Sequence, residues 1–255
     1  PALITAGSYS GVHLAATTNV QFKFNDMHAG RAGASDMVLL KASAGSTGLQ
    51  VKNNIFSSTM TLIEIAANSQ SGFLSNYNDF YSLSGGTNNV WGASTATSVL
   101  AWQGVSGQDA GANSVNPFWF SVAPGTEDFH PRSQFGGYNI GAAAFIFDSV
   151  TSQTIDAADP AESVSAEPSP NGGRANQGSY SGTAEASKTI KRLQVLLPGE
   201  ISVPGTVTGK TGSVSALSAG APFAVMVRAT DQNWNLNAAL ADTVVLATSA
   251  AIASN

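Results

Sequence analysis

Hydrophobic and polar residues alternate over short stretches of the chain, as they do in strands that bury one face. Val20, Phe22 and Phe24 alternate with polar residues, and the run 223–227 (Phe-Ala-Val-Met-Val) is rich in strand-forming residues. The best helical candidate is short, at 98–102, and begins with a Ser or Thr cap. Because Gly, Ser or Asn clusters bound the strand-like runs, the pattern predicts an all-β fold.

One short motif recurs at 25–27 (Asn-Asp-Met), 53–55 (Asn-Asn-Ile) and 78–80 (Asn-Asp-Phe). The spacing is that of one coil of a β-solenoid, in which each coil contributes short parallel strands and stacks on the next. Asparagines at the same turn of successive coils bond one another in a ladder. The motif therefore predicts a parallel β-helix, with coincidence in an Asn-rich chain as the alternative.

Aromatic residues gather after Leu83, where the strand pattern loosens. A Gly-Gly-Thr-Asn-Asn turn at 85–89 leads into a stretch that carries several large rings. A solenoid must cover its last coil, because an open end exposes strand edges and apolar side chains. We therefore expect this stretch to be a cap or a lateral insertion. Its aromatic residues are Trp91, Trp102, Phe118, Trp119 and Phe120.

The last part of the chain differs in composition. Residues 159–187 are rich in Pro, Gly and Ser, which indicates a linker or a long ordered loop. Strand-like runs follow at 193–197, 222–230 and 243–246, separated by turn residues. An immunoglobulin-like sandwich takes about 100 residues, so the segment 188–255 is too short for one. Either the chain was cut, or the missing strands come from elsewhere.

Four motifs occur in order at 128–130 (Asp-Phe-His), 154–160 (Thr-Ile-Asp-Ala-Ala-Asp-Pro), 167–168 (Glu-Pro) and 171–180 (Asn-Gly-Gly-Arg-Ala-Asn-Gln-Gly-Ser-Tyr). They resemble the C-terminal end of secreted bacterial right-handed parallel β-helix repeat proteins, and Asn-Asn-Ile-Phe at 53–56 resembles a turn of that family. The resemblance implies the fold. It implies little about function, since the same ending is attached to adhesins, surface-anchored repeat proteins and carbohydrate-active enzymes.

The segment 221–235 resembles an immunoglobulin-like module of long bacterial surface proteins. The first resemblance has two departures: Pro131-Arg132 stands where an aliphatic pair is usual, and 136–148 looks inserted, which suggests a cap remodelled for contact with another subunit. The two resemblances together imply a right-handed parallel β-helix followed by a short or incomplete immunoglobulin-like β-sandwich. The expected domains are a β-helix with its cap at 1–158, a linker at 159–187 and the sandwich module at 188–255.

The chain is poor in charge. Only 11% of its 255 residues are charged, the formal net charge is −5, and there is no Cys, whereas an average domain carries about 25% charged residues. A negative balance argues against nucleic acid, and the apolar stretches are shorter than the ~20 residues of a membrane helix. Without Cys, disulfides and thiolate metal sites are excluded. Sparse charge also leaves strand edges less guarded against pairing.

Acidic residues concentrate between 127 and 167, with one base, Arg132, among them. We interpret them as a solvated face and predict no cofactor and no metal ligand. A weak Ca²⁺ site between Asp148 and Asp159 stays open, because hard cations prefer clustered oxygen ligands, although no calcium-binding motif occurs. The acidic residues are Glu127, Asp128, Asp148, Asp156, Asp159, Glu162 and Glu167.

No catalytic constellation is evident. The three histidines are His13, His28 and His130, and the chain has neither a helical zinc motif nor a Gly-x-Ser-x-Gly elbow. We interpret His130 as a packed or turn residue and predict no catalytic residue. A polysaccharide lyase or hydrolase of β-helix type is the alternative, and hydrolysis needs two carboxylates at a fixed separation. The carboxylates before the acidic segment are Asp26, Asp36, Glu64, Asp79 and Asp109.

Aromatic side chains offer a further alternative, a non-catalytic glycan-binding module, because an exposed ring face stacks on a sugar. The competing interpretation places these rings in the core of the cap. Trp234 is interpreted as the core anchor of the sandwich. The aromatic candidates are Trp91, Trp102, Trp119, Tyr77, Tyr81 and Tyr138.

We therefore expect a non-catalytic structural protein of the bacterial surface or matrix, adhesive or self-assembling into a fibre or layer. Its expected partners are other copies of itself and a surface glycan. Since the chain starts at Pro1 and shows no signal segment, we expect an extracellular protein whose targeting signal lies outside this sequence. Strand pairing between chains is expected at 193–255, and a contact that does not close would give filaments.

Overall fold

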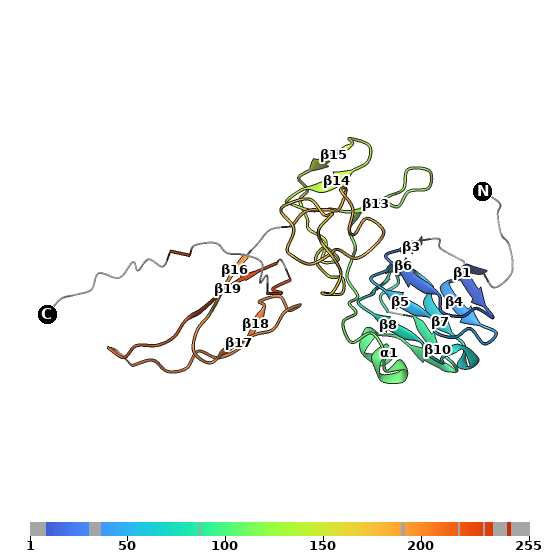
Figure 1. The fold of residues 1–255 in the computed structure, drawn as a ribbon, viewed down its shortest axis with the longest axis horizontal. Coiled ribbons are helices and arrows are strands. Elements are labelled where there is room, and N and C mark those ends of the chain that lie inside the picture. The colour runs from blue at the N-terminus through green and yellow to red at the C-terminus, as the bar shows by residue number, and fades with distance from the viewer. Residues whose placement is uncertain are drawn as a thin grey trace.

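The computed structural model describes residues 9–30, 37–86, 88–189, 192–218, 220–231, 233–236 and 244–245. Within these ranges the protein is mostly β, with one α-helix, and its strands form several separate sheets (Figure 1). The predicted all-β class is confirmed at this level.

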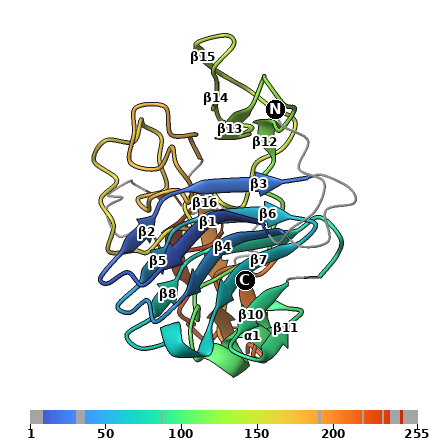
Figure 2. The same cartoon turned by 90° about the vertical axis from the view of Figure 1, so that its right-hand side faces the viewer.

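The N-terminal strands form three parallel sheets in which every third strand pairs (Figure 2). The chain passes through the β1, β2 and β3 sheets in turn and then repeats the circuit, so the residues of one circuit lie over those of the previous one. The strands are β1 (Tyr9–Ala15), β4 (Met37–Ser43) and β7 (Thr61–Ile65) in the first sheet, β2 (Gln21–Lys23), β5 (Gln50–Lys52) and β8 (Leu74–Asn76) in the second, and β3 (Asp26–Ala29), β6 (Ile55–Ser58) and β9 (Asp79–Ser82) in the third.

One left-handed residue turns the chain from the β2 sheet into the β3 sheet in every circuit. Phe24, Asn53 and Tyr77 occupy this position, with φ values of 54°, 59° and 56°. The strand register consequently aligns Asn54, not Asn53, with the asparagines that follow Phe24 and Tyr77. The predicted alignment of the motif was therefore wrong by one residue in its second copy, because Asn53 is used for the turn, a conformation that Asn tolerates.

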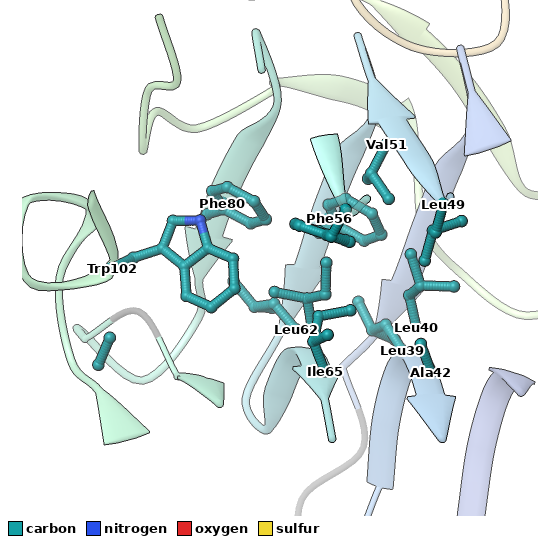
Figure 3. Packing of buried hydrophobic residues seen from close by; sticks show 13 residues of the cluster. Leu39, Leu40, Ala42, Leu49, Val51, Phe56, Leu62, Ile65, Phe80 and Trp102 are labelled. Carbon is teal, nitrogen blue, oxygen red and sulfur yellow. The ribbon is translucent and has the colours of Figure 1, made fainter. Parts of the chain in front are cut away.

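Buried apolar side chains from the three sheets fill the space between them (Figure 3). Phe56 and Phe80 stack with their ring centroids 5.6 Å apart, and Phe22 lies 6.2 Å from Phe56. Since burying one Leu, Ile or Phe contributes about 1.5–3 kcal/mol, this core is the main source of stability in the N-terminal part. Its other members include Leu39, Leu40, Ala42, Leu49, Val51, Leu62, Ile63 and Ile65.

The helix α1 (Val99–Ser106) covers one end of this core. It follows β10 (Asn89–Trp91) and β11 (Ser94–Ala96) in the chain. Ser98 is its N-cap and accepts the backbone N–H of Ala101 at 3.1 Å. The predicted helix at 98–102 is therefore confirmed and is four residues longer. Trp102 is fully buried, so this part of the aromatic stretch acts as the expected cap.

Two short antiparallel pairs follow the cap. β12 (Trp119–Ser121) pairs with β13 (Asp128–Pro131), and β14 (Gly137–Asn139) pairs with β15 (Ala144–Ile146). The β14–β15 hairpin lies within the segment expected to be an insertion. It exposes 56% of Ile140 and 83% of Phe147.

The chain from 150 to 189 contains turns but no strand or helix. It packs against the turns between the β2 and β3 sheets: Gln177 Nε2 donates to the carbonyl oxygen of Tyr77 at 2.7 Å, and the N–H of Gly178 donates to that of Asn53 at 2.9 Å. The segment interpreted as a linker or ordered loop thus has specific contacts with the N-terminal part. The domain boundaries drawn through it stay a prediction.

The C-terminal part contains two antiparallel pairs (Figure 1). β16 (Arg192–Leu196) pairs with β19 (Met226–Thr230), and β17 (Glu200–Ser202) pairs with β18 (Lys210–Gly212). The run at 193–197 therefore largely coincides with β16, only 226–230 of the run at 222–230 forms a strand, and the run at 243–246 lies mostly outside the described residues.

Candidate functional site

A ladder of asparagine side chains follows the turns that lead into the β3 sheet. Asn25 Nδ2 donates to Oδ1 of Asn54, and Asn54 Nδ2 donates to Oδ1 of Asn78, both at 2.9 Å. The backbone N–H groups of Asn25 and Asn54 donate to the same two oxygens at 2.9 and 3.0 Å. The predicted ladder is confirmed, with Asn54 in place of Asn53. An unsatisfied buried polar group costs about 1–3 kcal/mol, so these bonds are needed at fully buried Asn54 and Asn78.

Asp109 ends the ladder under the capping helix. Asn78 Nδ2 donates to its Oδ1 at 2.9 Å, and Trp102 Nε1 donates to its Oδ2 at 2.8 Å. Burial raises the pKa of Asp109 above its usual value, and these hydrogen bonds oppose that rise. Trp102 therefore closes both the apolar core and the polar ladder.

Asp26 and Asp79 are two of the carboxylates considered for catalysis. Asp26 on β3 and Asp79 on β9 both lie opposite Ile55 of β6, the strand between them. Asp26 Oδ2 accepts the N–H of Ser179 at 2.9 Å, and Asp79 Oδ1 accepts the N–H of Val115 at 2.8 Å. Burial raises the pKa of Asp26 to about 7 and raises that of Asp79 well above 3.8, to which the nearby Asp26 contributes. Both carboxyl groups hold later loops onto the edges of the β3 sheet.

The other carboxylates of that set lie in different places. Glu64 pairs with Lys41 at 2.8 Å, Asp109 ends the asparagine ladder, and Asp36 lies outside the described residues. Among the described residues, no acidic side chain lines the cleft beside Tyr77 or the one beside Trp119.

Acidic groups organise the long loop between 150 and 189. Glu167 Oε1 accepts the N–H groups of Asn176 and Gly182 at 3.0 and 2.9 Å. Burial raises the pKa of Asp156 well above its usual value, and the nearby charges of Asp231 and Glu167 raise it further. Part of the acidic run is therefore internal to the loop rather than a solvated face.

Asp148 and Asp159, between which a Ca²⁺ site was left open, bind different partners. Asp148 Oδ2 accepts the N–H of Ser133 at 3.3 Å, and Asp159 Oδ2 lies 2.8 Å from Lys52 Nζ. Across the described ranges, no three side chains of His, Cys, Asp or Glu are grouped so as to hold a metal ion.

His130 is packed, as interpreted from the sequence. Its ring is fully buried and stacks on Tyr180 with a centroid separation of 3.4 Å. Its Nδ1 lies 2.6 Å from Oδ1 of Asp128, and its Nε2 lies 3.4 Å from Oε2 of Glu185. The contacts enclose the imidazole between strand β13 and the long loop.

The aromatic candidates divide between core and clefts. Trp91 and Trp102 pack edge to face at 5.7 Å, and Trp102 is enclosed in the core. Trp234 is half-buried and lies under Arg192, whose Cζ is 5.2 Å from the ring centroid, so it is not enclosed as a core anchor. Tyr81 and Trp119 line one cleft and Tyr77 lines another.

The cleft beside Tyr77 has a volume of about 460 Å³ and joins three parts of the chain. Asn113 comes from the end of the N-terminal part, Arg174 from the long loop, and Asn233 and Asn235 from the C-terminal part. The guanidinium of Arg174 lies 5.5 Å from the centroid of the Tyr77 ring. That face of Tyr77 is therefore occupied by a side chain of the protein.

Side chains of strand β16 alternate between a buried and an exposed face. Gln194 and Leu196 are buried, and Gln194 Nε2 donates to the carbonyl oxygen of Gly209 at 2.7 Å. On the other face, Leu193 and Val195 are 58% and 45% exposed. Their cross-strand neighbours on that face are Ala229 and Val227. The strand-forming residues predicted these strands, but they did not reveal that Leu193 and Val195 are left exposed among the described residues.

No protein-family model, curated protein or solved structure matches this chain. Among the helical residues described, none forms a segment long and apolar enough to cross a membrane.

Proposed function

We propose that this chain is a non-catalytic structural protein of an extracellular surface or matrix that associates with other copies of itself through the β16–β19 ribbon. The observation that carries this proposal is the apolar face on which Leu193 and Val195 are exposed and their cross-strand neighbours Val227 and Ala229 are half-buried. All four of its members are apolar, and one Leu or Val contributes about 1.5–3 kcal/mol when buried.

The ribbon also has too few strands to be stable alone. An isolated pair of strands is marginally stable in water, and further strands or a packed face are needed. Within the described ranges β16 and β19 share a sheet only with each other, apart from an isolated bridge between Thr230 and Leu236, which leaves most of the outer edge of each strand unpaired there. A strand from a second copy would add main-chain hydrogen bonds at such an edge, as in β-augmentation. A second ribbon would instead cover the apolar face.

In the proposed assembly, the parallel sheets form the rigid N-terminal part of each chain. We interpret them as a right-handed parallel β-helix, supported by the pairing of every third strand, the recurrent left-handed turn and the asparagine ladder. The C-terminal part would be an incomplete immunoglobulin-like module that another chain completes. Low charge, 11% of residues, favours such contacts because it weakens repulsion between like chains.

Substitutions on the exposed face test this proposal. We expect Leu193→Lys and Val195→Lys to reduce the mass of the assemblies measured by light scattering, because each places a charge in the buried contact. Val207→Lys is the matched control, since Val207 is 96% exposed and does not belong to the face. Equal mass for all three variants and the unmodified chain would exclude this face of the ribbon as the contact.

A further inference from the structure

A groove of about 300 Å³ lies on the outer face of the β3 sheet. Its floor is formed by His28, Ser57 and Tyr81, which are opposite one another on β3, β6 and β9. Their preceding neighbours, among them the core residues Phe56 and Phe80, point inward, so strand alternation turns this column outward. With strands about 4.8 Å apart, the floor spans about 10 Å.

The wall of the groove is largely apolar and aromatic. Phe118, Val122 and Leu83 line it and are 38%, 43% and 40% exposed. The Trp119 ring meets that of His28 edge to face at 5.7 Å. Flat apolar surface beside a polar floor suits a ligand whose rings have apolar faces and polar edges, as sugars do.

Two buried donors in the lining have no hydrogen-bond partner in the described part of the chain. They are Nε1 of Trp119, a residue that is 8% exposed, and Nε of Arg132. Arg132 is the only residue with a formal charge in the lining, and Nη2 of Arg132 donates to the carbonyl oxygen of Phe120 at 3.1 Å. Because buried donors are normally satisfied, a ligand here should bring acceptors, and a carboxylate complements the guanidinium best.

We propose that this groove binds a short acidic saccharide, a chain of uronic acid units. A sugar ring packs against Phe118, the uronate carboxylate accepts from Arg132, and ring hydroxyls bond along the His28–Ser57–Tyr81 floor. Burial lowers the pKa of His28, so its ring is neutral at neutral pH and leaves Arg132 as the charge that selects the ligand. This site is independent of the proposed self-association, because the β16–β19 ribbon contributes no residue to it.

Calorimetric titration of the full chain tests the assignment. The probes are oligogalacturonate, oligoalginate and hyaluronan fragments, with a neutral galactan oligosaccharide of matched length and an acidic peptide as comparisons. We expect saturable binding of at least one acidic saccharide and binding of the neutral one that is at least about tenfold weaker, which is the usual effect of losing a hydrogen bond to a charged group.

Variants locate the binding in the groove. Phe118→Ala and Arg132→Gln should weaken the acidic saccharide by about tenfold or more, whereas Phe147→Ala, which removes an 83% exposed ring outside the groove, should not. Phe118 is partly exposed, so its variant keeps the test valid if Arg132→Gln unfolds. No binding by any acidic saccharide, binding of the peptide alone, or unchanged binding by Phe118→Ala would overturn the proposal. Leu193→Lys should bind as the unmodified chain does, which separates this outcome from a failure of self-association.

Discussion

Asp26 and Ser179 are 153 residues apart in the chain and are joined by a hydrogen bond, in which the N–H of Ser179 donates to Oδ2 of Asp26 at 2.9 Å. The contact fastens the long loop to the edge strand β3. It buries a carboxyl group close to two other groups that can carry negative charge, Asp79 and Tyr180. The attachment of the loop is therefore sensitive to pH.

We expect the free energy of unfolding to fall as pH rises from 5 to 8. The folded-state pKa of Asp26 is about 7, above its usual 3.8, so its contribution is fully present below the unfolded pKa and is lost as pH rises through 7. For one such group the loss is at most about 1.4 kcal/mol for each pH step of one. Thermal unfolding at pH 5 and pH 8, followed by circular dichroism, measures it.

The variant Asp26→Asn distinguishes the contribution of Asp26 to the pH dependence of stability from the contributions of other titrating groups. Asn keeps an oxygen for the N–H of Ser179 but carries no charge, so we expect the variant to lose less stability than the unmodified chain between pH 5 and 8. Glu127→Gln, at an exposed position, should leave the pH dependence unchanged. If Asp26→Asn has the pH dependence of the unmodified chain, Asp26 is not the group responsible.

Asn54→Ala should destabilise the protein by about 2–4 kcal/mol, because it removes the oxygen that accepts from the backbone N–H and Nδ2 of Asn25 and the Nδ2 that donates to Asn78. Urea unfolding gives the free energy, and Asn68→Ala, at an exposed position in a short 3₁₀ turn, is the control. A loss below about 0.5 kcal/mol, the scatter usual for surface substitutions, would mean that the ladder is not needed for stability.

Trp102→Phe tests the polar half of the cap. Phe keeps an aromatic ring against Phe80 and Trp91 but cannot donate to Oδ2 of Asp109. We expect a loss of about 1–3 kcal/mol from the unpaired buried oxygen, together with some loss from the smaller ring. In the Trp102→Phe variant, the additional substitution Asp109→Asn cannot restore the indole hydrogen bond, but it removes the carboxyl group, and any charge on it, from the buried site. If Trp102→Phe is as stable as the unmodified chain, the indole bond contributes nothing.

Incubation with polysaccharides tests the rival enzymatic function. We expect no new reducing or unsaturated ends from acidic or neutral glycans, because Asp26, Asp79 and Asp109 are engaged in buried contacts. Heat-denatured protein provides the background. Release of such ends above the background, abolished by Asp79→Asn, would establish a lyase or hydrolase instead.

Features that depend on neighbours along the chain could be predicted from the sequence. Alternation identified the strand around Phe22, the strand-forming residues at 223–227 overlap only the start of β19, and Ser98 marked the start of the helix. The recurring asparagines indicated a ladder, because stacking places like residues together. The misalignment of the motif, Asn53 for Asn54, came from a left-handed turn that periodicity does not encode.

Features that depend on distant contacts could not be predicted. The groove combines Tyr81 with Arg132, and nothing in either segment indicates that the other lies beside it. Similarly, Glu167 and Asp156 look like solvated acids in the sequence, but the loop folds around them. The exposed face of Leu193 and Val195 depends on which elements fail to cover it, and a hydrophobic pattern alone predicts burial.

Sedimentation velocity of the unmodified chain, over a wide range of concentrations, tests self-association through the β16–β19 ribbon most directly when it is run beside Val195→Lys and Val207→Lys. We expect the sedimentation coefficient to rise with concentration for the unmodified chain and for Val207→Lys but to stay at the monomer value for Val195→Lys. A monomer at every concentration in all three samples would contradict it.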